Sequence, residues 1–297
     1  MLQTIFRVGD EVASAVADGV PVVAMESTIY SAFGLPEPAN LECLERCDAV
    51  IRAAGAVPAM TAVLDGVAVV GIADNEVERV LGGTTKIAAR DLGHAHATAL
   101  GVGVTTVSAS VTLAARAGVA VFATGGIGGV HRGFEASMDV SADLFELAHT
   151  QMIVVCSGPK VILDLPRTRE ALETMGVTLV GYRTDDMPAF WARHSGLAVD
   201  MRADRPQDIA AVARARAALG IGGSILVCNP VTPDLAIDID VIEGWIASCI
   251  DDAPAGAAAT PWLLAEIARR SSGRSLAANK QLIIDNAALA GAIAACL

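Results

Sequence analysis

The sequence predicts an α/β fold in which helices pack against a mostly parallel sheet. Short apolar runs alternate with amphipathic stretches along the chain, the pattern of strands connected through helices. Hydrophobic residues make up 53% of the sequence but aromatic residues only 4%, and such a small, aliphatic interior suits this architecture. Because the 297 residues contain no repeat, low-complexity tract or flexible linker, we expect one domain spanning residues 1–297.

The first half of the chain is expected to begin this alternation. The uninterrupted apolar run VPVVAM (20–25) is typical of a buried strand, and residues 41–54 have the pattern of a helix. In residues 57–72, two apolar runs flank Asp65-Gly66, a dipeptide that favours a hairpin turn. A helix over 105–117 and a strand over 119–126 are predicted next.

The second half continues the same alternation. The apolar runs MIVVCSG, VTLVGY and SILVCNP predict strands at 152–158, 177–182 and 224–230. Helices are expected between and after these strands, at 142–149, 166–175, 206–218, 236–250, 261–271 and 279–296.

Composition and charge exclude several classes of protein. The net charge of −12 argues against a nucleic-acid-binding surface, although a few local donors would suffice for a phosphate-bearing small molecule. No apolar run reaches the length of a membrane span, and residues 1–19 show no signal-peptide pattern. The six cysteines are scattered without a second pair that could complete a zinc site. We therefore expect reduced thiols and a cytoplasmic protein.

Polar residues stand where several of the apolar runs end. These positions are Glu26, Thr124, Lys160 and Asn229, each within a few residues of a predicted strand. In open α/β sheets, ligands bind outside the carboxyl ends of the strands, where loops from several strands converge. The sequence therefore predicts a site at this edge of the sheet.

The segment TGGIGGVHRG (124–133) is unusually rich in glycine. Glycines admit positive φ and let a ligand approach main-chain N–H groups, which can bind an anion. His131 and Arg132 in the same segment favour an anionic ligand. The alternative is that the glycines only permit tight strand-to-helix packing, because a glycine run alone is weak evidence for a ligand.

Asp139 and Asp143 lie four residues apart in DVSAD. One explanation is helix capping, with Asp139 preceding a helix that Ser141 or Asp143 starts. The functional alternative is a hard divalent cation such as Mg²⁺ or Mn²⁺, held by one carboxylate and several waters.

Lys160 and Glu26 are the candidates for chemistry. Lys160 lies between the apolar segments VVC and VILDL, which favour a neutral amine, the form that attacks a sugar carbon and makes a Schiff base. Glu26 ends a buried strand, where desolvation raises the pKa of a carboxyl and suits it to general acid catalysis. The competing interpretations are a lysine that reaches solvent at a helix start and a solvated loop glutamate.

Other charged residues are ambiguous. Lys86 and Arg90 in TKIAARDL have the pattern of helix-surface charges unless folding brings them to the site. His94 and His96 lie in what reads as a plain helix and more often mark a surface than a metal ligand.

Taken together, these segments closely resemble the pseudouridine-5′-phosphate glycosidases, or indigoidine synthase A-like family. The matching blocks run in family order from about residue 7 to the last residues: AMESTI, TKIAARDL, ATGGIGGVHRG, MDVSADL, VVCSGPKVILDL, PAFW, CNP, TPWLL and SLAANKQLIIDNA. ATGGIGGVHRG and the block around Lys160 are highly specific in combination.

The resemblance implies a three-layer α/β/α sandwich, a homotrimer and reversible cleavage of the C–C glycosidic bond of pseudouridine 5′-phosphate to uracil and ribose 5-phosphate. It implies that Lys160 is the covalent nucleophile, Glu26 the proton donor and Asp139 the Mn²⁺ ligand. It also implies a set of substrate-binding positions: Lys86, Val107, Thr124, His131, Ser141, Ala142, Asp143 and Asn279.

One departure from the family pattern bears on the base. The family pattern reads Glu-Ser-Thr-Ile, two residues and then His-Gly, whereas this chain reads ESTIYSAFG, one residue longer and with Phe33 before Gly34. Two alternatives therefore stay open: a C–C glycosidase or synthase that acts on another base, and a non-catalytic phosphosugar-binding protein of the same fold.

Overall fold

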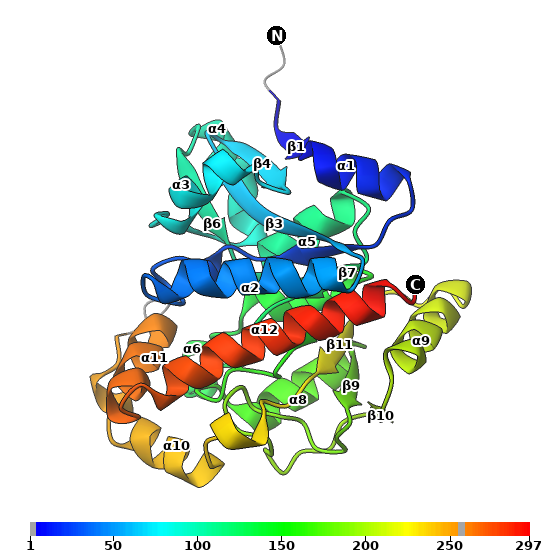
Figure 1. The fold of residues 1–297 in the computed structure, drawn as a ribbon. Helices are drawn as coiled ribbons and strands as arrows, with labels where there is room; N and C mark the ends of the chain where they lie inside the picture. The colour runs from blue at the N-terminus through cyan, green and yellow to red at the C-terminus, as the bar shows by residue number, and fades with distance from the viewer. Residues whose placement is uncertain (1–3, 255–258) are drawn as a thin grey trace.

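The structure, a computed structural model, describes residues 4–254 and 259–297, and these form an eleven-stranded sheet with helices on both faces (Figure 1). Seven strands, in the order β3-β2-β7-β8-β11-β9-β10, run parallel. The strand bounds are β1 (Phe6–Val8), β2 (Val22–Met25), β3 (Val57–Leu64), β4 (Val67–Val70), β5 (Lys86–Ile87), β6 (Val102–Thr105), β7 (Val121–Ala123), β8 (Ile153–Cys156), β9 (Thr178–Tyr182), β10 (Met201–Ala203) and β11 (Ile225–Cys228).

Strand β3 belongs to two parts of the sheet. Its first half, Val57 to Met60, pairs in parallel with β2, and its second half pairs antiparallel with β4 and β6. The predicted hairpin is confirmed: Asp65 and Gly66 connect β3 to β4 with φ of 50° and 77°. Two successive positive φ angles are what a tight hairpin turn of this kind requires.

The helices cover both faces of the sheet, so the predicted three-layer α/β/α sandwich with a mixed, mostly parallel sheet is confirmed. In Figure 1, α2 and α12 lie side by side across one face, with α5 and α8 behind the sheet. The bounds are α1 (Asp10–Ala17), α2 (Ala39–Ala53), α3 (Val77–Leu81), α4 (Leu92–Ala97), α5 (Val107–Arg116), α6 (Phe134–Ser137), α7 (Ala142–His149), α8 (Leu165–Thr174), α9 (Pro206–Ala218), α10 (Ile239–Ala247), α11 (Ala259–Arg270) and α12 (Arg274–Ala294).

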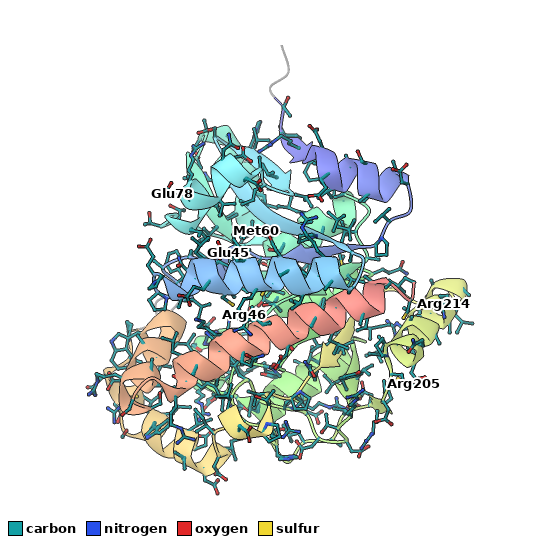
Figure 2. The ribbon with its side chains drawn as sticks, in the orientation of Figure 1. Glu45, Arg46, Met60, Glu78, Arg205 and Arg214 are labelled. Carbon is teal, nitrogen blue, oxygen red and sulfur yellow. The ribbon has the colours of Figure 1, made fainter. Side chains whose placement is uncertain are left out.

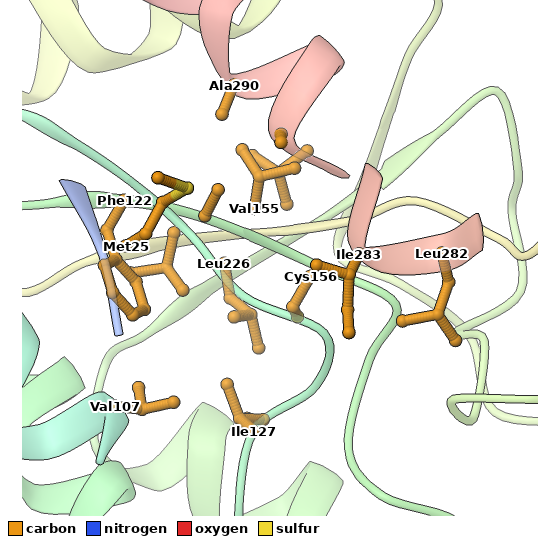
Figure 3. Packing of buried hydrophobic residues seen from close by; sticks show 14 of the residues in the cluster. Met25, Val107, Phe122, Ile127, Val155, Cys156, Leu226, Leu282, Ile283 and Ala290 are labelled. Carbon is orange, nitrogen blue, oxygen red and sulfur yellow. The ribbon is translucent and has the colours of Figure 1, made fainter. Parts of the chain in front are cut away.

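The core consists of aliphatic layers on either side of the strands. Figure 3 shows the strand residues Leu226 and Cys156 between Ile283 of α12 and Val107 of α5. Charged side chains lie on the outer faces of the helices, as Glu45 and Arg46 of α2 do in Figure 2. The opposite face of α2 is apolar and buried against α12, which explains the helical periodicity of residues 41–54.

The predicted strands and helices are present with shifts of a few residues at their ends. Two differences are larger. The helix expected at 236–250 is shorter, because Asp238 caps α10 so that it begins at Ile239, and residues 250–252 form a separate 3₁₀ turn after it. The last helix begins at Arg274 and not at 279, directly after Gly273, whose φ is +82°.

One interpretation is wrong: the segment TKIAARDL is not a single helix. Lys86 lies in the short strand β5, and a 3₁₀ turn follows at residues 89–91. Helix α4 begins at the last residue of the segment, Leu92, and carries His94 and His96. The strand β6, which pairs with β5, was not expected either. None of the helices in the described parts of the chain is long and apolar enough to cross a membrane. The single-domain prediction also covers residues 1–3 and 255–258, which lie outside the described residues, and it stays a prediction.

Candidate active site

A pocket lies where the order of the parallel strands reverses direction. From β2 the chain passes to β3 on one side, whereas β7 lies on the other side of β2, so the loops after β2 and β7 diverge. Ligand sites in open α/β sheets form at such switch points. The pocket is lined by Glu26, Thr28, Ile29, Phe33, Gly34, Lys86, Gly125, Gly126, Lys160, Phe190, Leu264 and Asn279.

The pocket collects the candidate residues for chemistry from distant parts of the chain. The sequence contains only three lysines, and two of them, Lys86 and Lys160, line this pocket together with Glu26. Because ionisable side chains are normally exposed, their convergence in one cleft indicates a functional site.

Glu26 is buried, with 4% of its surface exposed, directly after the last residue of β2. Burial raises the pKa of its carboxyl to about 7, although the charge of Lys160 and a hydrogen bond from Thr124 both act to lower it. Thr124 donates this bond through its hydroxyl group. A carboxyl with this pKa exists in both protonation states near neutral pH and can therefore both give and take a proton.

Lys160 is held by backbone pairing between two loops. Its N–H donates to the carbonyl of Ile127 at 3.1 Å, and the N–H of Ile127 donates to the carbonyl of Gly158 at 3.2 Å. These bonds extend the pairing of β7 and β8 beyond the strand ends. The loop that carries Lys160 is thereby fixed to the loop that carries the glycines.

Lys86 reaches the pocket from β5, on the mixed part of the sheet. Burial, followed by the charge of Lys160, lowers the pKa of its ammonium group, while Glu26 and Asp143 oppose this shift. The ring of Phe33 lies over the ammonium nitrogen, 5.1 Å from it to the ring centroid, which is within cation–π range. Lys86 thus brings a cationic side chain into the pocket, which suits an anionic ligand.

Asp143 connects the beginnings of two helices and does not line the pocket. Its carboxylate accepts the N–H of Ser108 in the first turn of α5 at 3.0 Å and the N–H of Gly128 at 2.8 Å. Ser141 is the N-cap of α7 and accepts the N–H of Asp143, which confirms the expected capping. Val107 and Ala142, the first residues of α5 and α7, therefore lie close together behind the pocket.

The glycines of this loop mainly leave room for side chains of the protein itself, which a Cβ at these positions would meet. A Cβ on Gly128 would lie 2.2 Å from Oγ of Ser141, and one on Gly129 would lie 2.5 Å from the side chain of Thr168. The main-chain anion cradle expected here is used internally, because Gly128 donates to the carboxylate of Asp143. Tight packing thus explains most of this glycine run, and only Gly125 and Gly126 line the pocket.

The guanidinium of Arg132 is engaged within the protein and does not line the pocket. Its guanidinium donates to the carbonyls of Val161 and Ile162 and pairs with Glu243 at 2.6 Å. His131 does not line the pocket either; its Nδ1 lies 3.9 Å from Oδ2 of Asp139.

Asp139 fits a cation that keeps most of its water shell. Its carboxylate is 39% exposed, and no group of three or more His, Cys, Asp or Glu residues that could hold a metal occurs in the described part of the chain. A closed protein cage for a metal is thereby absent from these residues. A single carboxylate completed by water is a donor set that Mn²⁺ and Mg²⁺ accept.

Asn286 is a polar residue of the site that sequence reasoning missed. It is fully buried on α12, and its amide donates to the carbonyl of Thr124 at 2.8 Å and to Oγ of Ser157 at 3.2 Å. Its side-chain oxygen accepts from Asn229 at 3.1 Å. One side chain thus ties together the ends of β7, β8 and β11. Its helical context gave no sign of this role.

We expect Asn286→Leu to lower the free energy of unfolding by about 2–4 kcal/mol, because it leaves several buried polar groups without partners. Urea denaturation followed by circular dichroism measures this. Gln281→Ala is the matched control, since Gln281 lies on the same helix and bonds only to the side chain of Asp285; its expected effect is within about 0.5 kcal/mol. Equal losses of stability in the two variants would contradict the role of Asn286 in holding the strand ends together.

A larger cavity exists at the other edge of the sheet. It has a volume of about 280 Å³ and is bordered by Ile153, Ile225 and Arg216, at the amino ends of the strands. The active-site pocket holds only about 50 Å³, enough for ordered water. The position of the smaller pocket at the switch point and the ionisable residues that line it favour this pocket as the candidate site.

Comparison with known proteins agrees with this geometry. The family model described as indigoidine synthase A like protein matches residues 11–296. A protein of Methylobacterium nodulans named pseudouridine-5′-phosphate glycosidase is 50% identical, over 97% of this chain and 86% of that protein.

Two solved structures share the fold. The prealnumycin C-glycosynthase AlnA, solved in complex with ribulose 5-phosphate, is 38% identical with a TM-score of 0.91, over 99% of this chain and 97% of that chain. An indigoidine synthase A-like protein from Thermotoga maritima is 34% identical with a TM-score of 0.90, over 98% and 96%. The chain therefore belongs to the indigoidine synthase A-like family, as its sequence motifs indicate.

Proposed function

We propose that the protein reversibly cleaves the C–C glycosidic bond of pseudouridine 5′-phosphate, giving uracil and ribose 5-phosphate. The observation that carries the proposal is the convergence of Lys160 with Glu26, a buried carboxyl whose pKa is about 7, in one pocket at the switch point. The names of the relatives and the phosphosugar held by the structural neighbour support the same substrate class.

The leaving atom explains why a lysine is needed. In this bond the pyrimidine leaves through carbon C5, so electrons must be supplied at C1′ of the sugar. The neutral amine of Lys160 bonds to C1′ while the C1′–O4′ bond breaks and O4′ takes a proton. The nitrogen lone pair then forms an iminium as the C1′–C5 bond breaks and its electron pair accepts a proton at C5. Water hydrolyses the iminium to ribose 5-phosphate and restores the amine.

Glu26 supplies the proton in this scheme. Its carboxyl faces the pocket beside Lys160, and its pKa near neutrality lets it protonate O4′ or C5 and be reprotonated between steps. Thr124 holds the carboxyl in place through its hydroxyl hydrogen bond.

The substrate phosphate has a proposed place behind the pocket. Val107 and Ser141-Ala142-Asp143 lie at the adjacent beginnings of α5 and α7, where the main-chain N–H groups that Asp143 and Ser141 do not already bind favour anions. Lys86 adds positive charge from the pocket side, and we assign His131 and Asn279 to the periphery of the same site. A homotrimeric assembly is part of this proposal, and sedimentation analysis tests it.

The direct test is incubation of the purified protein with pseudouridine 5′-phosphate and Mn²⁺, following uracil release. Formation of pseudouridine 5′-phosphate from uracil and ribose 5-phosphate is the expected reverse reaction. A protein that binds ribose 5-phosphate but turns over neither mixture would instead support the non-catalytic phosphosugar-binding alternative.

We expect the activity to depend on a divalent cation. Asp139 would hold Mn²⁺ with water completing its shell, and the ion would supply positive charge and ordered water near the substrate. Chelation should abolish uracil release, added Mn²⁺ should restore it, and Asp139→Ala should raise the Mn²⁺ concentration that gives half-maximal activity. Glu135→Ala, an exposed carboxylate of α6, is the control. Full activity of exhaustively chelated protein would overturn this prediction.

A second candidate function is C–C bond formation with a different base. Phe33 lines the pocket in the loop where the chain departs from the family pattern, and one structural neighbour is a C-glycosynthase. Restoring the His-Gly pattern by replacing Phe33 with histidine and deleting Ala32 should change the ranking of uracil against other aromatic acceptors. An unchanged ranking would leave the first function as the better assignment.

A further inference from the structure

The segment Pro188–Phe190 lies against both loops of the pocket. Phe190 has φ of +58°, in the left-handed region that bulky residues rarely adopt, and it lines the pocket with Lys160. Its N–H donates to the carbonyl of Ser157 at 2.8 Å, and only 3% of its surface is exposed. An unfavourable backbone angle at a buried ring beside a candidate nucleophile requires a compensating reason.

Two glycines are shaped to receive this segment. A Cβ on Gly126 would lie 2.7 Å from the ring of Phe190. A Cβ on Gly158, whose φ is +84°, would lie 1.9 Å from the carbonyl oxygen of Pro188. Gly158 stands two residues before Lys160, so the segment touches the nucleophile loop on one side and the glycine loop on the other.

The segment is anchored from outside the pocket. Met187 donates to the carbonyl of Leu197 at 2.7 Å, and Oγ of Ser195 donates to the carbonyl of Met187 at 2.6 Å. Ala189 and Ala192 exchange two main-chain hydrogen bonds at 2.9 and 3.0 Å. These bonds close a compact loop, which can hold the strained angle at Phe190.

We propose that Phe190 is the positioning residue for Lys160. In this proposal its ring, which lines the same pocket as Lys160, shields the amine, and its main-chain hydrogen bond to Ser157 and its packing on Gly126 hold the nucleophile loop in place. The inference rests on the proposed function for the reaction that Lys160 performs. The shielding of the amine by the ring is a separate claim and can be tested without turnover.

The first test measures the reactivity of Lys160 itself. The protein is treated briefly with acetic anhydride, and acetylation of each of the three lysines is followed by peptide mass spectrometry. Phe190→Ala should raise the labelling rate of Lys160 several-fold, because the ring no longer covers the amine, while Lys280 on α12 serves as internal reference. Unchanged labelling of Lys160 would overturn the proposal, whatever reaction the protein catalyses.

The second test separates positioning from stability. Phe190→Gly relieves the left-handed backbone whereas Phe190→Ala does not, so the glycine variant should be the more stable of two variants that both lack the ring. Borohydride trapping of ribose 5-phosphate on Lys160 should fall about 100-fold in both, since a misplacement of about 1 Å costs a factor of this size. Phe190→Leu, which retains an apolar wall, should recover most of the trapping rate.

A control variant and the stability of the Phe190 variants distinguish a positioning role from a purely structural one. Phe145→Ala, an exposed ring on α7, should trap like the wild type. If trapping instead rises with stability, so that Phe190→Gly regains the wild-type rate, the ring has only a structural role and the proposal is wrong. Absence of trapping in the wild type would count against the proposed function. The acetylation of Lys160 in Phe190→Ala and in the wild type would then be the test of the role of Phe190.

Discussion

Lys160→Ala should abolish uracil release, lowering turnover by about 10⁴-fold or more, as removal of a covalent nucleophile does. Ribose 5-phosphate with borohydride should trap an adduct on the Lys160 peptide of the wild type and none in the variant. Lys160→Arg should be equally inactive, because a guanidinium stays protonated and cannot attack C1′. Uracil release followed by chromatography, with circular dichroism to verify folding, measures both variants.

Lys280→Ala is the matched control for these variants. Lys280 is the third lysine of the chain and pairs with Glu42 outside the pocket, so its removal should leave turnover unchanged. Trapping of the sugar on Lys86, which lines the same pocket, would move the nucleophile and refute the scheme proposed for Lys160.

Glu26→Gln should lower kcat by about 10²–10⁴-fold, the usual contribution of a general acid. The amide can still accept the hydrogen bond from Thr124, so the variant keeps the shape of the site and loses the proton. Because burial raises the pKa of Glu26 to about 7, kcat/KM of the wild type should fall as pH rises through this value. The pH profile of the variant should lack this limb, and an identical profile would argue against Glu26 as the acid.

The same carboxyl makes stability depend on pH. The folded state holds the Glu26 proton more tightly than the unfolded state, in which the pKa of this carboxyl is near 4.5. The contribution of Glu26 to stability is therefore fully present below pH 4.5 and is lost as the pH rises through 7. The loss is on the order of 3 kcal/mol. Glu26→Gln should remove it and be more stable than the wild type at pH 8, although nearly inactive. Denaturation curves that shift in parallel between pH 5 and 8 would contradict this expectation.

The sequence predicts most of the sheet because its strands are buried on both faces and their apolar runs are continuous. Residues 20–25 and 152–158 are examples, and the Asp65-Gly66 turn has its own local signal. The two-residue strand β5 has no such pattern, and only its pairing with β6 shows that Lys86 lies on a strand and not on a helix.

The site is only partly readable from sequence, because its supporting contacts are tertiary. Strand ends identify Glu26 and Lys160, but the ties made by Asn286 and the left-handed angle of Phe190 depend on segments far apart in the chain. The glycine loop was misread in part for the same reason. Its partners, among them Ser141 and Thr168, are known only once the loops are folded together.

The packing of α12 on α2 has a consequence for the order of events during synthesis. The buried face of α2, which includes Cys43, Cys47 and Ile51, leaves the ribosome long before the helix that covers it. Until residues 274–294 emerge, this apolar strip and its two thiols stay open to chaperones and oxidants. Asn286 lies on the same helix, so the strand ends that carry the candidate chemistry are tied together only after residues 274–294 have been synthesised. The pocket that Lys160 lines is therefore completed only after this helix has packed against the strand ends.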